Sequence, residues 1–161
     1  MSDKWSEWTD EPSADAPTPD YGPGHVGVWC DVDGRNVSTA AELDAWVKER
    51  LWTFMPYGGR GQVWLVGSRL KEGSPHSWAL EVAVDPEVDR AAVTWLPTGQ
   101  HGSEPSVSAP DEPLVVQQTD PDYHVVEIPA EQARVTVEVA TRAMGEYVET
   151  GERPACLGWA T

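Results

Sequence analysis

Apolar residues repeat at helical spacing in two parts of the chain. The first repeat predicts a helix over residues 40–52, and Thr39 followed by Glu42 forms the pattern of a capping box at its start. The second predicts a helix over residues 130–149, with Pro129 at its beginning, where a proline costs no hydrogen bond. The apolar positions are Leu43, Val47, Leu51 and Phe54 in the first helix, and Ala133, Val137, Ala140, Met144 and Val148 in the second. We expect each of these stripes to face the core.

Between the two helices the hydrophobic period falls to two residues, which is the period of β-strands. The segments expected to form strands are residues 25–30, 62–66, 78–84, 91–96, 114–116 and 123–128, with a short edge strand within residues 154–159. Residues 31–34 carry turn chemistry, and residues 97–113, rich in Pro, Gly and Ser, are expected to form a loop. A run of strands with a helix near each end predicts an α+β fold, a mostly antiparallel β-sheet with two principal helices packed on it.

The composition divides the chain into a tail and one domain. Residues 1–24 contain six acids, one base and four prolines, and such a segment cannot bury enough surface to offset its ordering entropy. We therefore expect an acidic tail without fixed structure, followed by a single domain over residues 25–161. No long apolar run and no secretory leader are recognised, so the expected location is the cytoplasm.

The charge balance restricts the partners of the protein. Twenty-seven acids against eleven Lys and Arg give a net charge of −16, which disfavours binding to nucleic acid or to anionic membranes and favours a basic partner. Between Arg90 and Arg134 there are seven acids and no Lys or Arg. Such a region is either a solvated face that keeps the protein soluble or a docking surface for a cationic protein.

The docking hypothesis names seven candidate partner-binding residues. The acidic ones would pair with a basic partner, and the aromatic ones would act as anchors in the contact. The candidate charge partners are Glu104, Asp111, Glu112, Asp120 and Asp122, and the candidate anchors are Trp95 and Tyr123.

Motifs for catalysis and for metal binding are not found. Residues 22–27 match G-x-G-x-x-G, but they precede a strand, whereas a dinucleotide site needs this motif after one. The four histidines are too widely spaced for a zinc motif, and Cys30 and Cys156 lack a C-x-x-C partner. We expect a protein that is not an enzyme, with no metal and no cofactor. The two cysteines are expected as buried thiols, with a single disulfide as the alternative.

Several short motifs, in their order along the chain, resemble one known family. They are the helix start at residues 38–44, the strand at residues 80–84, Glu127-Ile128-Pro129 before the last helix, and the tail Thr-Gly-Glu-Arg-Pro-Ala-Cys-Leu-Gly-Trp at residues 150–159. Over about residues 25–160 the chain resembles the Imm1-type immunity proteins of bacterial polymorphic toxin systems. The resemblance implies a non-enzymatic inhibitor in the cytoplasm of the producing cell, with a toxin as its partner, in this family often one of the deaminase superfamily.

Two hypotheses of function follow. The first is an immunity protein that binds and neutralises a basic toxin through its acidic surface. The alternative is an acidic, non-enzymatic accessory or scaffold protein that binds a basic protein through residues 1–24. Deletion of this tail separates the two, because only the alternative requires it.

Overall fold

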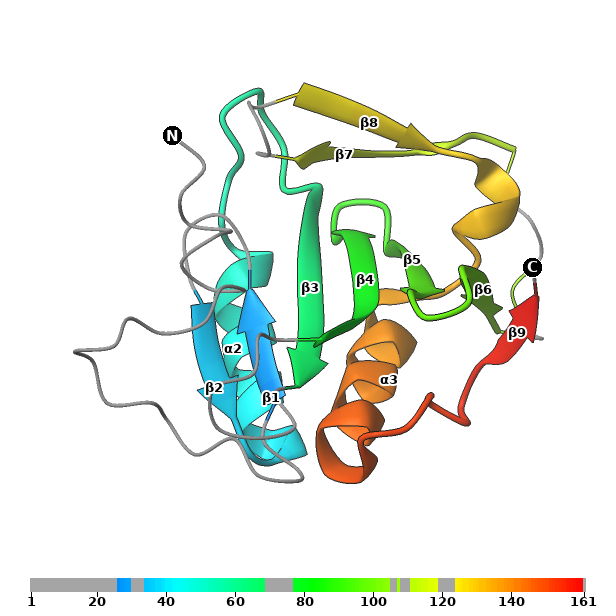
Figure 1. Cartoon of the computed structure of the whole chain (residues 1–161). Helices are drawn as coiled ribbons and strands as arrows, with labels where there is room; N and C mark the ends of the chain where they lie inside the picture. The colour runs from blue at the N-terminus through cyan, green and yellow to red at the C-terminus, as the bar shows by residue number, and fades with distance from the viewer. Residues whose placement is uncertain are drawn as a thin grey trace.

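The computed structural model describes residues 26–29, 34–68, 77–104, 107, 111–118 and 124–160 (Figure 1). The expected acidic tail lies outside these residues. Among them, no helix is long and apolar enough to cross a membrane.

The described strands form one sheet of nine. They are β1 (Val26–Trp29), β2 (Gly34–Val37), β3 (Gln62–Ser68), β4 (Ser77–Asp85), β5 (Arg90–Trp95), β6 (Gln100–Ser103), β7 (Leu114–Gln118), β8 (His124–Ile128) and β9 (Gly158–Ala160). Seven of them follow one another in the order β2-β1-β3-β4-β5-β6-β9, and the β7–β8 hairpin joins through a contact of β7 with β3. That contact, Gln62 opposite Gln117, is parallel, whereas the other strand pairs are antiparallel. The predicted mostly antiparallel α+β fold is confirmed.

Two strands of the structure were not predicted. β2 lies where a turn was expected to lead directly to the helix, and β6 lies inside the expected loop of residues 97–113. Val37 is the only large apolar residue of β2, and β6 reads Gln-His-Gly-Ser. Both strands are held by backbone pairing with a neighbour, and such pairing leaves no alternation of apolar and polar residues in the sequence.

The first predicted helix is α2 (Ala40–Leu51), and its start has the predicted cause. The amide of Glu42 donates to Oγ1 of Thr39 over 3.1 Å, and the amide of Thr39 donates back to Oε1 of Glu42 over 3.2 Å, which completes the capping box. The helix buries Leu43, Trp46 and Val47. The prediction for Phe54 was wrong, because the helix ends before this residue and its side chain is exposed.

The second helix, α3 (Val137–Thr150), begins seven residues later than predicted. Residues 130–132 form a 3-10 turn, and residues 134 and 135 form isolated bridges to Ser103 and Ala91. The amide of Ala91 donates to the carbonyl of Val135 over 2.7 Å, so this segment pairs with the sheet instead of winding into a helix. Thr136 then caps α3 by accepting the amide of Val139, and Gly151, at φ 72°, ends it.

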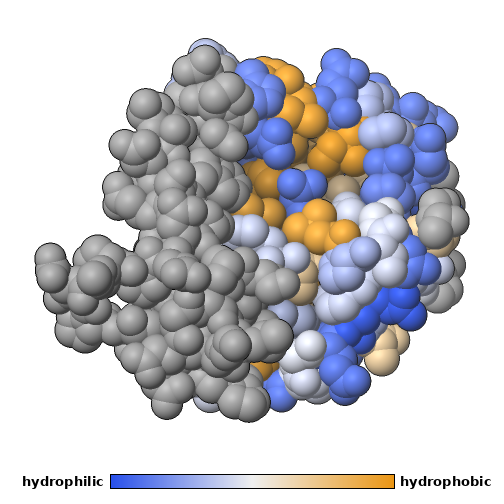
Figure 2. Space-filling model, viewed as in Figure 1, coloured by the Kyte–Doolittle hydropathy of each residue, from blue (hydrophilic) through white to orange (hydrophobic). Residues whose placement is uncertain are grey.

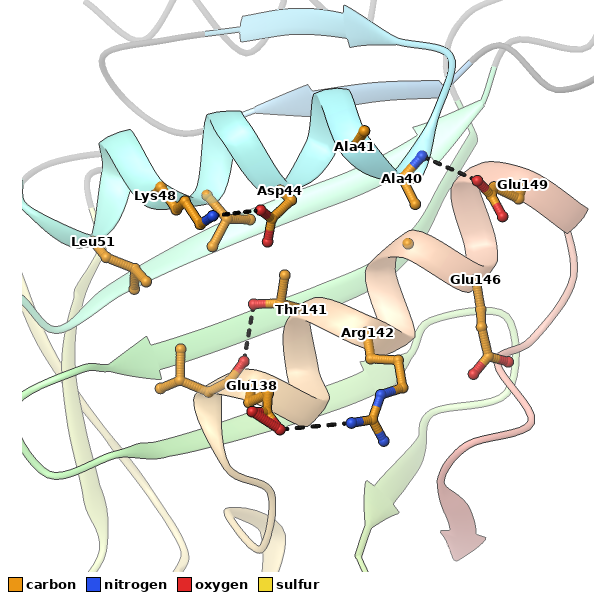
Figure 3. Close-up of a pocket in the computed structure, with 13 residues that line it drawn as sticks. Ala40, Ala41, Asp44, Lys48, Leu51, Glu138, Thr141, Arg142, Glu146 and Glu149 are labelled. Carbon is orange, nitrogen blue, oxygen red and sulfur yellow. Dashed lines mark hydrogen bonds and ion pairs between the residues drawn. The ribbon is translucent and has the colours of Figure 1, made fainter.

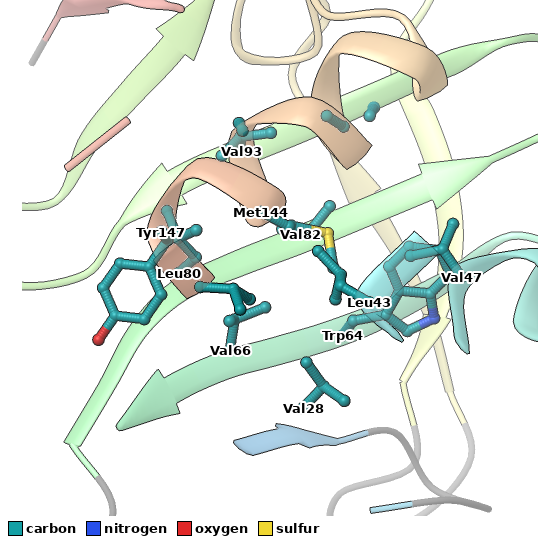
Figure 4. Close-up of a cluster of buried hydrophobic side chains, with 14 of the residues drawn as sticks. Val28, Leu43, Val47, Trp64, Val66, Leu80, Val82, Val93, Met144 and Tyr147 are labelled. Carbon is teal, nitrogen blue, oxygen red and sulfur yellow. The ribbon is translucent and has the colours of Figure 1, made fainter. Parts of the chain in front are cut away.

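Both helices pack on one face of the sheet and enclose the main core (Figure 4). Alternate residues of the central strands, such as Val66 and Val82, point toward the helices and are fully buried. Trp46 of α2 meets Trp64 of β3 edge to face, with ring centroids 5.3 Å apart.

The opposite face of the sheet is covered in part by the β7–β8 hairpin. Leu114 and Val116 of β7 pack with Ala83 and Ala92 of the central strands and with Ala133 in a second, smaller cluster. Figure 2 shows that hydrophobic residues gather over this hairpin and just below it, with hydrophilic residues around them. The hairpin therefore forms a third layer, and its outer side is part of the surface of the molecule.

Candidate functional site

Glu104, the first of the predicted acidic residues, is bound within the fold. Its Oε1 accepts the amide of Thr136 over 2.5 Å and the hydroxyl of the same residue over 2.9 Å. Thr136 is the N-cap of α3, so the carboxylate lies at the helix terminus where negative charge is most stabilised. Asp89 adds a second carboxylate there, since its Oδ1 accepts the amide of Val137.

Asp111 and Glu112 are exposed directly before β7. The backbone carbonyl of Glu112 accepts the guanidinium of Arg90 over 2.9 Å, and the same guanidinium donates to the carbonyl of Ala133. The structure therefore brings Glu104 and Glu112 to the same segment, residues 133–136. Three other predicted residues, Asp120, Asp122 and Tyr123, lie outside the described residues.

Trp95 is not brought together with these acidic residues. Its half-buried ring packs against the main core and meets Tyr147 of α3 edge to face, with centroids 6.0 Å apart. It lies at the end of β5, whereas Arg90, which contacts Glu112, lies at the beginning of that strand. Six residues of strand span about 17 Å.

Among the described residues, the most exposed aromatic side chains lie elsewhere, on the loop from α2 to β3. The exposed fractions are 74% for Trp52, 69% for Phe54 and 62% for Tyr57. The guanidinium of Arg60 lies 5.1 Å from the ring centroid of Trp52 and 5.3 Å from that of Phe54, so one cation stacks on two aromatic rings. We call these four residues the aromatic surface.

Backbone hydrogen bonds and one apolar side chain hold this loop in shape. Met55 is buried beneath it, its amide donates to the carbonyl of Gly59, and its carbonyl accepts the amide of Gly58. Gly58 and Gly59 both have positive φ, at 96° and 70°, which side chains with a Cβ rarely adopt. The loop is thus a compact turn around Met55.

Two buried glutamines fasten the loop to the sheet. Gln117 of β7 accepts the amide of Tyr57 with its side-chain oxygen over 3.0 Å and donates to the carbonyl of Gly58 over 2.7 Å. Gln62 of β3 donates to the carbonyls of Arg50 and Arg60 over 2.9 and 3.2 Å. Since these glutamines are 6% and 3% exposed, their hydrogen bonds are shielded from water.

The aromatic surface was not predicted from the sequence, because Phe54 was assigned to the apolar stripe of the first helix and Trp52 to that helix itself. A usable signal was present. Pro56 and Gly58-Gly59 mark the end of the helix, so aromatic residues this close to them belong to a loop. No apolar pattern beside this loop in the sequence indicates a core that would cover them.

A groove of about 760 Å³ runs between α2 and α3 on the side away from the sheet (Figure 3). Four of its charged side chains form ion pairs within one helix, since Lys48 pairs with Asp44 over 2.9 Å and Arg142 with Glu138 over 3.6 Å. Glu149 accepts the amide of Ala40 across the groove, which joins the two helices. The groove therefore presents ion pairs and helix caps, and its groups serve the packing of the helices.

In the part of the chain that the structure describes, Cys156 is the titratable group with the largest change in pKa. Cys156 is a free thiol, and its burial, together with the hydrogen bond that the thiol donates to the carboxylate of Glu146, raises its pKa to about 12. A thiol with this pKa stays protonated at neutral pH and is a poor nucleophile. Within the described ranges, no three His, Cys, Asp or Glu side chains are grouped so that they could hold a metal ion.

Comparisons with known proteins add one finding. The model of the protein family described as Immunity protein Imm1 matches residues 31–161 of the chain. Neither the curated proteins nor the solved structures gave a match.

Proposed function

We propose, since the chain belongs to the Imm1 immunity protein family, that it neutralises a deaminase-superfamily toxin by placing an acidic surface over the toxin's basic substrate groove. The family match over residues 31–161 is the observation that carries this proposal. Membership in the family makes the chain an immunity protein with a cognate toxin as partner. The class of toxin, the acidic surface and a cytoplasmic site of action are parts of the proposal.

The charge of the chain supports an acidic mode of inhibition. A toxin that acts on nucleic acid needs a groove lined by Lys and Arg, and a protein of net charge −16 is attracted to such a groove. Specific inhibition requires burial of about 800 Å² on each partner, which one face of a chain of 161 residues can supply.

The five acids within residues 104–122 are proposed for this contact. Asp111 and Glu112 are exposed, whereas Glu104 already accepts the amide and hydroxyl of Thr136 and adds its charge from a fixed position. Asp120 and Asp122 complete the proposed set, and a role of Trp95 and Tyr123 as anchors stays a prediction. The proposal includes no chemistry by this chain, and the protonated thiol of Cys156 is consistent with that.

Replacement of the exposed carboxylates by lysine tests the acidic mode. We expect the double variants D111K/E112K and D120K/D122K to bind a toxin domain encoded next to the gene of this protein with association at least about tenfold slower at low salt, because steering depends on charge. Dissociation should change little. Stopped-flow or surface plasmon resonance at two ionic strengths measures both rates.

A matched control alters the charge equally at another place. The double variant E138K/E152K changes residues on α3 and directly after it and should retain most of the association rate. If all three double variants associate at the wild-type rate, or all are slowed equally, the acidic surface is not where the toxin binds. If the wild-type protein does not bind or neutralise the toxin, the proposed function itself is wrong.

A further inference from the structure

We propose that the aromatic surface is the centre of the toxin contact, and that it fits a toxin face with an apolar hollow bordered by Lys and Arg. This inference rests on the proposed function and adds to it the place of tight binding. Its basis is the combination of exposed aromatic rings, a stacked arginine and a loop that is already ordered in the free protein.

The exposure of these rings is unusual for a solvated surface. Trp52, Phe54 and Tyr57 all lie within six residues of chain, and each leaves more than half of its side chain in water. Exposed aromatic residues in one patch mark interaction sites, and Trp, Tyr and Arg are the residues that most often dominate the binding energy of an interface. The aromatic surface holds all three types together with a phenylalanine.

The outer side of the β7–β8 hairpin extends this surface. Gln117, which holds the loop, lies opposite Val125 on β8, and Val115 is its neighbour two positions along β7. Residues related in this way point to the same side of a sheet, and both valines are exposed. Gln117 therefore connects the loop that carries the aromatic surface to two exposed apolar side chains, those of Val115 and Val125.

The order of the loop lowers the cost of binding. The side chains of Gln62 and Gln117 fix its backbone, and a Cβ at Gly61 would lie 2.7 Å from the carbonyl oxygen of Val115, so the chain approaches β7 closely. Arg60 stacks on two rings and restricts their rotation. A surface that is held in its binding geometry loses less conformational entropy on association.

The charges around the aromatic surface select the partner. Glu87, whose Oε1 accepts the amide of Arg60, and Glu127, which pairs with Val115 on the hairpin, are exposed acids at its border. Residues 91–133 contain no Lys or Arg, and Arg60, stacked on Trp52 and Phe54, is the cation of the aromatic surface itself. An aromatic centre with an acidic border is complementary to an apolar hollow with a basic border.

The same charges argue against a second copy of this chain as the occupant. Two molecules of net charge −16 repel each other, and the acidic borders of two aromatic surfaces would face one another in a symmetric dimer. A cationic toxin would instead be attracted by the acidic border. We therefore assign the surface to the toxin.

Alanine substitutions test the inference through the dissociation rate. The probe is a toxin domain encoded next to the gene of this protein, purified as a catalytically inactive variant. We expect Trp52→Ala and Phe54→Ala each to raise the dissociation rate about 30-fold or more, with association and its salt dependence nearly unchanged, as for residues at the centre of an interface. Leu96→Ala is the matched control, because this exposed apolar residue lies on the turn after β5 and should leave both rates at the wild-type value.

The outcomes separate this inference from the proposed function. Since the side chains of Trp52 and Phe54 are mostly exposed, the variants should keep the circular dichroism spectrum and melting temperature of the wild type. If the wild type binds the toxin and both variants dissociate at its rate, the inference is overturned and the proposed function stands. The inference is also overturned if size-exclusion chromatography shows the wild type as a dimer and Trp52→Ala as a monomer, while this variant releases the toxin at the wild-type rate. If the wild type does not bind, both proposals fall.

Discussion

A half-buried carboxylate on the central sheet shows how the surroundings of one residue set its energetics. Glu81 lies on β4, between Leu65 of β3 and Thr94 of β5, and its burial raises its pKa above the ordinary value of about 4.5. The folded protein therefore binds this proton more tightly than the unfolded chain does. Its contribution to stability is fully present below about pH 4.5 and is lost as the pH rises through the raised pKa.

We predict that Glu81→Gln makes the protein more stable than the wild type at pH 7, because the amide removes the buried charge. The difference should shrink toward zero at about pH 4, where the wild-type carboxyl is protonated. Urea unfolding at the two pH values measures it, and Glu127→Gln, on an exposed position of β8, serves as the control. An equal effect of Glu81→Gln at both pH values would show that the pKa of Glu81 does not differ between the folded and unfolded states.

At the scale of elements, α3 depends on residues that are distant in sequence. Its first turn receives carboxylates from Glu104, 32 residues away from Thr136, and from Asp89, 48 residues away from Val137. These contacts satisfy amide groups that have no partner within the helix and place negative charge at its positive end. The start of α3 is thus determined by the sheet on which it packs.

This dependence predicts a structural role for Glu104 beside its charge. Glu104→Ala leaves the amide and hydroxyl of Thr136 without their acceptor, and we expect it to lower the free energy of unfolding by about 1–3 kcal/mol. Glu112→Ala removes the same charge from an exposed side chain and should change it by less than about 0.5 kcal/mol. Chemical denaturation compares the two variants. Equal stability would mean that the hydrogen bonds of Glu104 contribute nothing net.

At the scale of the whole molecule, two surfaces have different proposed roles in one binding event. The acidic residues are proposed to act over a distance on the rate of encounter, and the aromatic surface to act in contact on the rate of release. The helices lie on the other side of the sheet from the β7–β8 hairpin, and the ion pairs beside their groove form within each helix. The separation of the helical face from the proposed binding face is a property of the complete fold.

The domain organisation gives a prediction at the same scale. The family match begins at residue 31, so we expect deletion of residues 1–24 to leave the melting temperature and the neutralisation of the toxin unchanged. Growth of cells that co-express the toxin with the full or the shortened protein measures this. Loss of protection with an intact fold would favour the accessory or scaffold protein that acts through its tail.

The sequence by itself determined those features that depend on residues close together along the chain. The capping box of Thr39 and Glu42, the alternation that marks β4, the stop at Gly151 and the order of the family motifs all act within a few residues, and each could be predicted. Only the tertiary structure decided that residues 134 and 135 pair with the sheet, that Glu104 caps α3, and that Gln117 holds the loop at Tyr57. These outcomes follow from contacts across 30 or more residues, whose free energies outweigh local preference and leave no periodic trace in the sequence.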